Sequence, residues 1–244
     1  MDSLTAPART LRAGTTVARA RPSERLRLTI QLGAGRLDPL SVRFWEHPRL
    51  RDLFPEYYLT LYASMRATVP LLEAAAARAR ELAPADAVAA ALEPYLVQHA
   101  REELHHDDWL LEDMELLGLD PAAARCRHAP ADVAEMIGAQ HYWLTYTHPI
   151  TLLGCFAVLE GSPPEAETLD AVAGRTGLPR AALRTLYKHA QLDPHHRDDL
   201  DDVLDHLPLT PAHQEMLGLS ALHVVDRLAD ILTRLLAAHP QPEG

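Results

Sequence analysis

The sequence predicts an all-α protein, a single domain built as a bundle of about seven helices. Of its 244 residues 48% are hydrophobic, which is enough to bury a substantial core. Alanine and leucine are abundant, while glycine (11 residues) and aromatic residues (5%) are scarce. This composition favours helices because Ala and Leu lose little rotamer freedom there. No segment alternates apolar and polar residues as a half-buried strand does.

The start of the chain is predicted to differ from the rest. Residues 1–21 are rich in arginine and lack the apolar run of a secretory signal, so we expect them to form a disordered tail. The helical domain is expected to cover residues 22–244, because no repeat or low-complexity linker divides the chain after the tail.

Prolines and glycines mark the ends of the predicted helices. A short first helix stops before Pro48, whose ring favours an extended residue ahead of it. Pro84 ends the next helix, Gly118 suits a left-handed cap of the following one, and Pro149 should kink the long helix after that. The predicted helices cover residues 37–45, 55–82, 87–117, 131–160, 165–173, 179–205 and 211–238.

Charge and composition exclude several classes of protein. A formal net charge of −11 argues against a nucleic-acid partner, which requires a basic surface. The chain has no run of about 18 apolar residues that could cross a membrane. Its two cysteines, Cys126 and Cys155, form no CxxC pair and suit a reducing compartment, so a cytoplasmic location is expected.

The predicted helix over residues 87–117 carries histidines and carboxylates on one side. At about 100° per residue, Glu103 lies at roughly +40° and His106 at roughly −20° from His99. Glu102 lies at about −60°, still on that side. Such a stripe can present several metal ligands without bending the backbone.

The predicted helix over residues 179–205 repeats this arrangement. Asp193 lies at roughly +40° and His196 at roughly −20° from His189. Chance alignment is one interpretation, because the chain has 14 histidines. Two stripes with matching spacing favour metal binding instead, because facing helices of a bundle are where carboxylate-bridged metal pairs are built.

The side-chain types in the two stripes indicate which metal they suit. No cysteine joins the set, so a structural zinc site of the thiolate kind is not expected. Imidazole together with carboxylate suits iron or manganese, and iron is the usual choice for dioxygen chemistry.

At these residues the chain resembles the haem-oxygenase-like diiron oxidases and oxygenases, often described as iron-containing redox enzymes. Their second core helix reads EExxH followed by WL, which residues 102–106 and 109–110 match. Their last ligand helix reads HxxxDxxH, which is similar to residues 189–196. Between the two they place a glutamate near the end of an apolar helix, and Glu160 resembles that residue.

The resemblance, which covers roughly residues 39–196, implies a haem-oxygenase-like helical bundle that holds two iron ions. It implies no catalytic residue beyond the metal ligands and no further cofactor. The ligands that it implies are Glu103, His106, Glu160, His189, Asp193 and His196.

The chain departs from the family pattern at two places. Some members carry a glutamate seven residues before the helix-two histidine, where this chain has His99. His99 is then a substitute ligand, a residue that orients a ligand, or a packing residue, and the sequence leaves these three open. Other members add a glutamate from the first core helix. Glu73 is the one candidate for it here and equally suits a solvent-facing position, and the role of Glu102 is open as well.

The function that the resemblance implies is that of a non-haem diiron enzyme in natural-product biosynthesis. It would activate O₂ to oxidise an amino-acid-like or fatty-acid-like substrate by N-oxygenation, desaturation or C–C cleavage. One alternative is a cofactor-free helical enzyme of the thiaminase-like or quinone-cofactor-synthesising kind, and another is a non-catalytic iron-binding protein. The expected partners are a small-molecule substrate and O₂. An electron donor and a second copy of the chain are further candidates, whereas nucleic acid and membrane are not expected.

Overall fold

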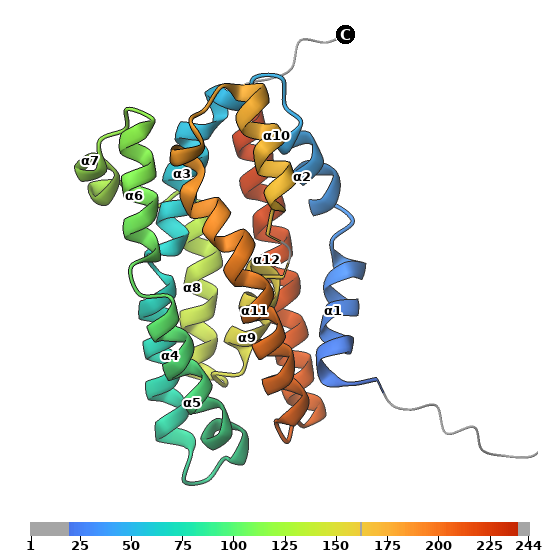
Figure 1. Cartoon of the computed structure of the whole chain (residues 1–244). Helices are drawn as coiled ribbons and strands as arrows, with labels where there is room; N and C mark the ends of the chain where they lie inside the picture. The colour runs from blue at the N-terminus through green and yellow to red at the C-terminus, as the bar shows by residue number, and fades with distance from the viewer. Residues whose placement is uncertain (1–19, 162, 239–244) are drawn as a thin grey trace, which may run out of the picture.

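The computed structural model describes residues 20–161 and 163–238, and within them the chain is all-α, as predicted (Figure 1). The expected tail lies outside the described residues except for its last two positions, and Arg21 there forms an ion pair with Glu24 in the first helix. The helices are α1 (Pro22–Gly33), α2 (Leu37–Trp45), α3 (Leu50–Met65), α4 (Thr68–Leu82), α5 (Ala87–Glu102), α6 (His106–Leu116), α7 (Pro121–Cys126), α8 (Ala131–Tyr146), α9 (Thr151–Leu159), α10 (Ala166–Thr176), the 3-10 helix η1 (Arg180–Leu183), α11 (Arg184–His206) and α12 (Pro211–Ala237).

The predicted number of seven helices is too low, mainly because three predicted long helices are each divided in two. The segment 55–82 becomes α3 and α4, the segment 87–117 becomes α5 and α6, and the segment 131–160 becomes α8 and α9. Pro149 stands in the last of these breaks, where it separates two helices and does not merely kink one. The helices α1 and α7 were not predicted.

The break between α5 and α6 has no proline or glycine. His105 has φ 70° and is the one non-glycine residue with positive φ in the described part of the chain. A left-handed residue cannot continue a right-handed helix, so α5 ends and α6 starts in a new direction. Leu104 and His105 are exposed, while Glu103 and His106 on either side are buried. The break therefore directs both of these ligand-type side chains into the bundle.

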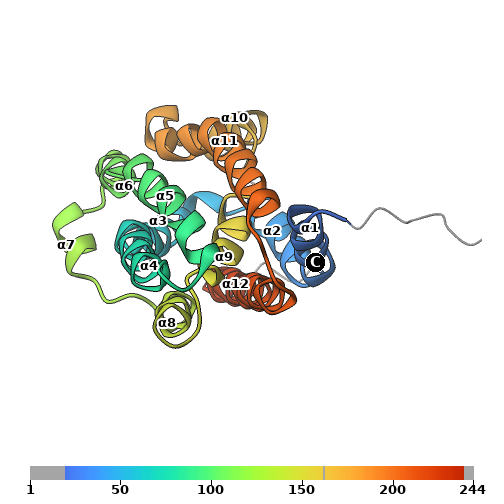
Figure 2. The ribbon, with the colours of Figure 1, turned by 90° about the horizontal axis from the view of Figure 1, so that it is seen from below.

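Helix α9 lies near the centre of the bundle in the end-on view (Figure 2), where it packs against α12, α8, α1 and α11. All its residues from Thr151 to Ala157 are buried, which is the pattern of a helix without a solvent-facing side. A Cβ atom added at Gly154 would overlap the backbone carbonyl oxygen of Leu217 on α12, so glycine allows these two helices to approach closely. Because α9 ends at Leu159, the next residue, Glu160, is placed in the interior.

The buried side chains form two hydrophobic clusters, one at each end of the bundle. Leu96, Phe156 and Leu200 belong to the first cluster, and Leu110 and Leu186 belong to the second. Along α5–α6 and along α11, the predicted metal ligands therefore lie between residues of one cluster and residues of the other. These polar ligand-type side chains thus lie at the junction of the two apolar clusters.

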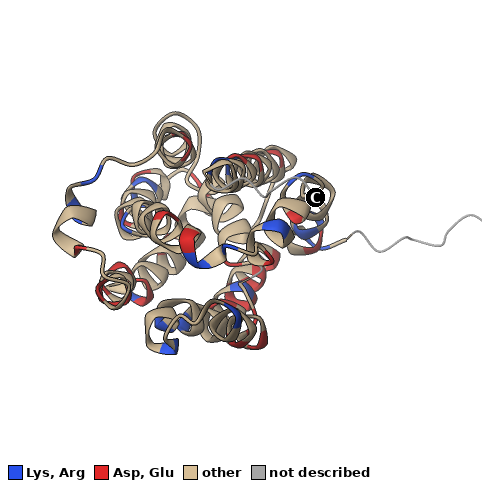
Figure 3. Ribbon diagram, turned by 90° about the horizontal axis from the view of Figure 1, so that it is seen from above, with Lys and Arg blue, Asp and Glu red and all other residues tan. Residues whose placement is uncertain are grey.

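The outside of the bundle carries charges of both signs. Segments with Lys or Arg and segments with Asp or Glu alternate around the ribbon seen from above (Figure 3). None of the helices in residues 20–161 and 163–238 has the length and apolar character needed to cross a membrane.

Candidate metal centre

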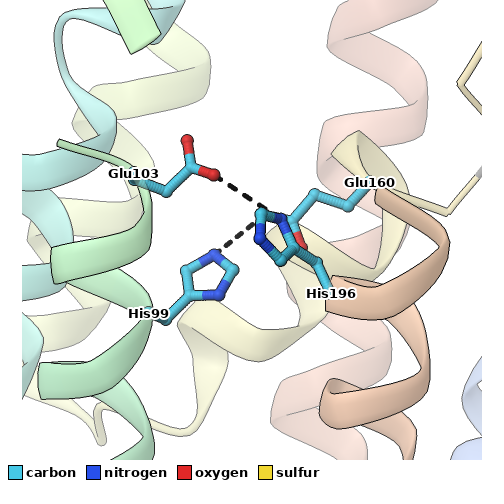
Figure 4. A group of neighbouring side chains, drawn as sticks. All are labelled: His99, Glu103, Glu160 and His196. Carbon is cyan, nitrogen blue, oxygen red and sulfur yellow. Dashed lines mark hydrogen bonds and ion pairs between the residues drawn. The ribbon is translucent and has the colours of Figure 1, made fainter. Parts of the chain in front are cut away.

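Four side chains from α5, α11 and the ends of neighbouring helices point toward one another in the middle of the bundle (Figure 4). They are His99, Glu103, Glu160 and His196, and one potential ligand atom of each lies within 4.8 Å of the others. His99 Nε2 is 3.0 Å from Glu160 Oε1, and His196 Nδ1 is 3.6 Å from Glu103 Oε1. All four are at least nine-tenths buried. We call this set group A.

A second set of donors shares Glu103 with group A. Glu103, His106 and His189 also have ligand atoms within 4.8 Å of one another, and we call them group B. Glu103 Oε2 lies 3.2 Å from His106 Nδ1, while Glu103 Oε1 faces His196 of group A. The two oxygens of one buried carboxylate thus face two different sets of imidazoles, which is the arrangement that a carboxylate bridging two metal ions requires.

Asp193 belongs to neither group, although it lies one helical turn from both His189 and His196. Its side chain is 4% exposed, and Oδ1 has no hydrogen-bond partner. Burial and the charges of Glu160 and Glu103 raise the pKa of Asp193 to about 8. At neutral pH this carboxyl group therefore holds a proton in the metal-free chain.

The structure brings five of the six predicted ligands together in groups A and B and places Asp193 beside them. It also places His99, whose role was open, inside group A. Glu102 is exposed and accepts a hydrogen bond from Gln98, and Glu73 is exposed on α4, so neither takes part. The prediction of one continuous helix over residues 87–117 is wrong, because His105 interrupts it, yet Glu103 and His106 still face the same space.

The carboxylates of the two groups lack ordinary counter-charges. Among the described residues, no Lys or Arg forms an ion pair with Glu103, Glu160 or Asp193. Burial lowers the pKa of His99, but the hydrogen bond and charge of Glu160 outweigh it, so this pKa is raised. Burial raises the pKa of Glu103, but the neighbouring imidazoles, His106 first among them, outweigh it, so this pKa is lowered. Within residues 20–161 and 163–238, the imidazoles are thus the groups that supply positive charge to these carboxylates.

Several neighbours orient the ring nitrogens, and sequence reasoning did not identify them. His189 Nδ1 donates to the carbonyl oxygen of Thr185 at 2.9 Å, which leaves Nε2 free to bind a metal. The ring of Trp109 stacks on His106 with centroids 4.1 Å apart, and Phe156 packs on His99 at 5.1 Å. The spacing of four residues between Thr185 and His189 could have suggested the first contact, but any helical histidine has such a carbonyl behind it.

The residues present fit a bound metal. His106 Nδ1, His196 Nδ1, Glu160 Oε2 and Asp193 Oδ1 are buried without a hydrogen-bond partner. A buried polar atom without a partner costs about 1–3 kcal/mol, and more if it is charged. Divalent cations bound in the two groups would lie beside the residues that carry the first three of these atoms and would offset the buried charge of Glu103 and Glu160. The donors are imidazole nitrogen and carboxylate oxygen, the set that suits iron and manganese.

A cavity of about 200 Å³ adjoins the two groups. Its wall includes Glu103, Glu160, His189 and Asp193 on one side. The rest is mostly apolar and includes Leu61, Met65, Phe156, Leu159 and Leu186. The donors are thus accessible from a small, largely apolar space.

A third set of donors, Asp86, His148 and His213, does not suit a metal. His148 Nδ1 accepts a hydrogen bond from the Ile150 amide, so the proton of the neutral ring is on Nε2, which faces Asp86 Oδ2 at 3.3 Å. His213 Nδ1 accepts from the Thr210 amide in the same way. Because the outward nitrogens of both rings carry protons, this set is better described as two imidazoles beside one helix-capping carboxylate.

Comparisons with known proteins agree with the fold and the type of site. The sequence matches the family model described as iron-containing redox enzyme over residues 55–228. None of the curated proteins compared with this sequence matches it. A domain of unknown function with a heme oxygenase-like fold, from Shewanella denitrificans OS217, superposes with a TM-score of 0.72 at 14% identity and covers 87% of this chain and 90% of that one. A TenA homolog from Pseudomonas syringae pv. tomato str. DC3000 superposes with a TM-score of 0.70 at 12% identity. The match covers 93% of this chain and 98% of that one. At such identities the likeness shows the fold alone, and the predicted haem-oxygenase-like bundle is confirmed.

Proposed function

The chain belongs to the family of iron-containing redox enzymes, and we propose that groups A and B each bind one iron ion and that the pair activates O₂ to oxidise a small organic substrate. The observation that carries this proposal is the position of Glu103, which is a member of both groups. Iron bound there would supply the redox chemistry that amino-acid side chains cannot perform.

The surrounding residues of the chain would support this chemistry by fixing the ligands. The Thr185 carbonyl sets the tautomer of His189, and the stacked ring of Trp109 limits rotation of His106. Phe156 and the neighbouring apolar residues keep bulk water away from group A. Asp193, whose carboxyl group has a raised pKa, would release a proton when metal binds.

The cavity favours an enzyme over a protein that only stores or carries iron. A pure binding site has no need for an apolar space of this size beside the donors, whereas a substrate pocket is typically apolar with a few polar groups. The substrate that we propose is amino-acid-like or fatty-acid-like, and the reaction is N-oxygenation, desaturation or C–C cleavage in natural-product biosynthesis.

A cofactor-free enzyme that attacks its substrate with a thiol would require an accessible cysteine beside the cavity. Cys126 is exposed on α7, and burial raises the pKa of the Cys155 thiol far above its usual range. A reactive cysteine requires an accessible thiolate, and neither cysteine lines the cavity beside the groups.

The test is to load the protein anaerobically with Fe(II), expose it to O₂ and follow the visible absorption. We expect a transient visible band in the native chain and no such band in His189→Ala, which removes a donor from group B. His195→Ala serves as the matched control, because His195 is on the same helix as His189 but is exposed and belongs to neither group. A native chain that binds iron and does not react with O₂ would contradict the proposal.

A further inference from the structure

Asp113 carries a buried carboxyl group on α6 that belongs to neither group A nor group B. Its side chain is 1% exposed. It lies seven residues after His106, so at about 100° per residue the two side chains share one side of α6. Asp113 Oδ2 accepts a hydrogen bond of 2.7 Å from the backbone N–H of Thr185 on α11. Asp113 thus connects the helix that carries His106 to the helix that carries His189.

The hydrogen bond from Thr185 caps the start of α11. Thr185 lies in the first turn of this helix, where backbone N–H groups have no partner within the helix itself. Leu183, the residue before the helix, has no side-chain acceptor to offer, and Thr185 is fully buried, so water does not reach it. The carboxyl group of Asp113 therefore caps α11 from a neighbouring helix, at the end where the helix dipole favours negative charge.

The backbone of Thr185 links this cap to a predicted metal ligand. Its N–H donates to Asp113, and its carbonyl oxygen accepts from His189 Nδ1 at 2.9 Å. If the start of α11 moved away from α6, the carbonyl oxygen that orients His189 would move with it. The imidazole would then no longer meet the other donors of group B.

Arg184 forms a second contact between the same two helices. As the first residue of α11, it donates from Nη2 to the carbonyl oxygen of Trp109 on α6 at 3.0 Å, and its Nε lies 3.4 Å from Asp113 Oδ1. The ring of Trp109 stacks on His106. The contacts of Asp113 and Arg184 therefore hold together the two helices from which His106 and His189 come.

Group A is held by other parts of the fold. His99 comes from α5, and Glu160 follows α9. His196 is on α11, but it lies eleven residues after Thr185 (196 − 185), which is about three helical turns. A movement at the start of α11 would therefore displace the donors of group B more than those of group A.

We propose that Asp113 is a positioning residue of the metal centre, whose carboxyl group fixes the start of α11 against α6 and so sets the approach of His189 to the other donors of group B. Group A forms without it. This inference rests on the proposed function, because it requires that the two groups bind metal. Asp113 acts through Thr185, so its loss should change the affinity and geometry of one metal site without removing a ligand.

The experiment titrates Co(II) into metal-free protein and records the visible absorption, which depends on the coordination geometry of the bound ion. A site of this kind that holds Fe(II) binds Co(II) at least as tightly, so Co(II) is a suitable probe. Asp113→Ala removes the acceptor, and Asp113→Asn keeps one. Glu112→Ala is the matched control, because Glu112 is the adjacent residue and pairs with Arg184, but its side chain is 62% exposed.

We expect the native chain and Glu112→Ala to bind two Co(II) ions. In Asp113→Ala one ion should bind at least about tenfold more weakly and with an altered spectrum, because loss of a group that orients a ligand typically weakens metal binding by about 10–100-fold. The other ion should bind as in the native chain. Asp113→Asn should restore most of the lost affinity and the native spectrum, because its amide oxygen can accept the same hydrogen bond.

Arg184→Ala tests the same contact without a substitution in the core, because the Arg184 side chain is 39% exposed. It should weaken the same ion as Asp113→Ala. The thermal unfolding midpoint of each metal-free chain is measured alongside, to show which variants are folded.

Native affinity for both ions in Asp113→Ala, equal weakening of both, or a failure of Asp113→Asn to restore binding would overturn the inference. If Asp113→Ala does not fold, native binding of both ions by Arg184→Ala overturns it instead. These results leave the proposed function intact. A native chain that binds no Co(II) overturns the proposed function, and this inference with it.

Discussion

Glu103 Oε1 lies 3.6 Å from His196 Nδ1, and Glu103 Oε2 lies 3.2 Å from His106 Nδ1. A carboxylate that is 8% exposed and has no Lys or Arg partner in the described residues is costly to bury unless cations approach it. The surrounding imidazoles offset part of this cost by lowering its pKa, and a pair of divalent ions would offset the rest. At the scale of single residues, the site is therefore built for a ligand with positive charge.

Asp193 should make the stability of the metal-free protein depend on pH. Its pKa is raised from 3.8 to about 8 by burial and by Glu160 and Glu103. Because the folded state binds this proton more tightly than the unfolded state, the contribution of Asp193 to stability is lost as the pH rises from about 4 through about 8. The thermal unfolding midpoint of metal-free protein should therefore fall over this range, and fall less in Asp193→Asn. Parallel curves for the two chains would show that Asp193 is not buried with a raised pKa.

The candidate ligands could be predicted from residue type and spacing, but their grouping could not. His99 stood at a position where spacing alone allowed three roles, and its 3.0 Å contact with Glu160 arises from the packing of α5 against the end of α9. The position of Glu103 in both groups also depends on three helices that meet in space. No local pattern in the sequence contains that information.

At the scale of helices, the left-handed residue between α5 and α6 sets the direction of two ligands. His105 is exposed, and a left-handed conformation costs a non-glycine residue on the order of 1 kcal/mol. We expect His105→Gly to stabilise the protein by about 0.5–1 kcal/mol and to leave iron binding unchanged. His105→Val, whose branched side chain resists this conformation, should destabilise it and weaken iron binding. Urea unfolding and metal analysis of the three chains provide the check, and equal stability would refute a strained position 105.

The close approach of α9 and α12 at Gly154 holds Glu160 in place. An alanine there would overlap the Leu217 carbonyl, so Gly154→Ala should destabilise the fold by about 1–3 kcal/mol and weaken iron binding through displacement of α9. Gly138→Ala on α8 is the control, because nothing lies within 4 Å of its added Cβ atom, and it should stabilise the protein by about 0.5–1 kcal/mol. Similar denaturant midpoints for the two variants would contradict this packing argument.

The ends of helices could be predicted where proline or glycine marks them, as at Pro84 after α4 and at Gly118, which has φ 77°. The break at His105 could not, since histidine gives no local signal for a left-handed conformation and the surrounding pattern suits one continuous helix. The break between α5 and α6 is thus set by the packing of the whole bundle. This packing overrides the local preference of the sequence for one continuous helix.

At the scale of the whole molecule, groups A and B lie between two hydrophobic clusters and contribute little apolar packing of their own. Metal binding should therefore stabilise the bundle between the two clusters, where apolar packing contributes least. Iron or zinc at about one hundred times its Kd would add about 2.7 kcal/mol per site, and a chelator should remove this gain. Thermal unfolding with and without metal should show the shift in the native chain and a smaller one in His196→Ala. An identical midpoint after chelation would mean that no metal couples to folding.

The most direct test of the central claim, a shared Glu103 between two metal sites, is to count the iron bound per chain after anaerobic titration. The native chain should bind two ions, His189→Ala should lose the ion of group B, and Glu103→Ala should lose both. Glu102→Ala, which removes an exposed carboxylate next to Glu103 that belongs to neither group, should keep two. If Glu103→Ala binds as much iron as the native chain, or if the native chain binds none, then the account of this site as a carboxylate-bridged pair is wrong.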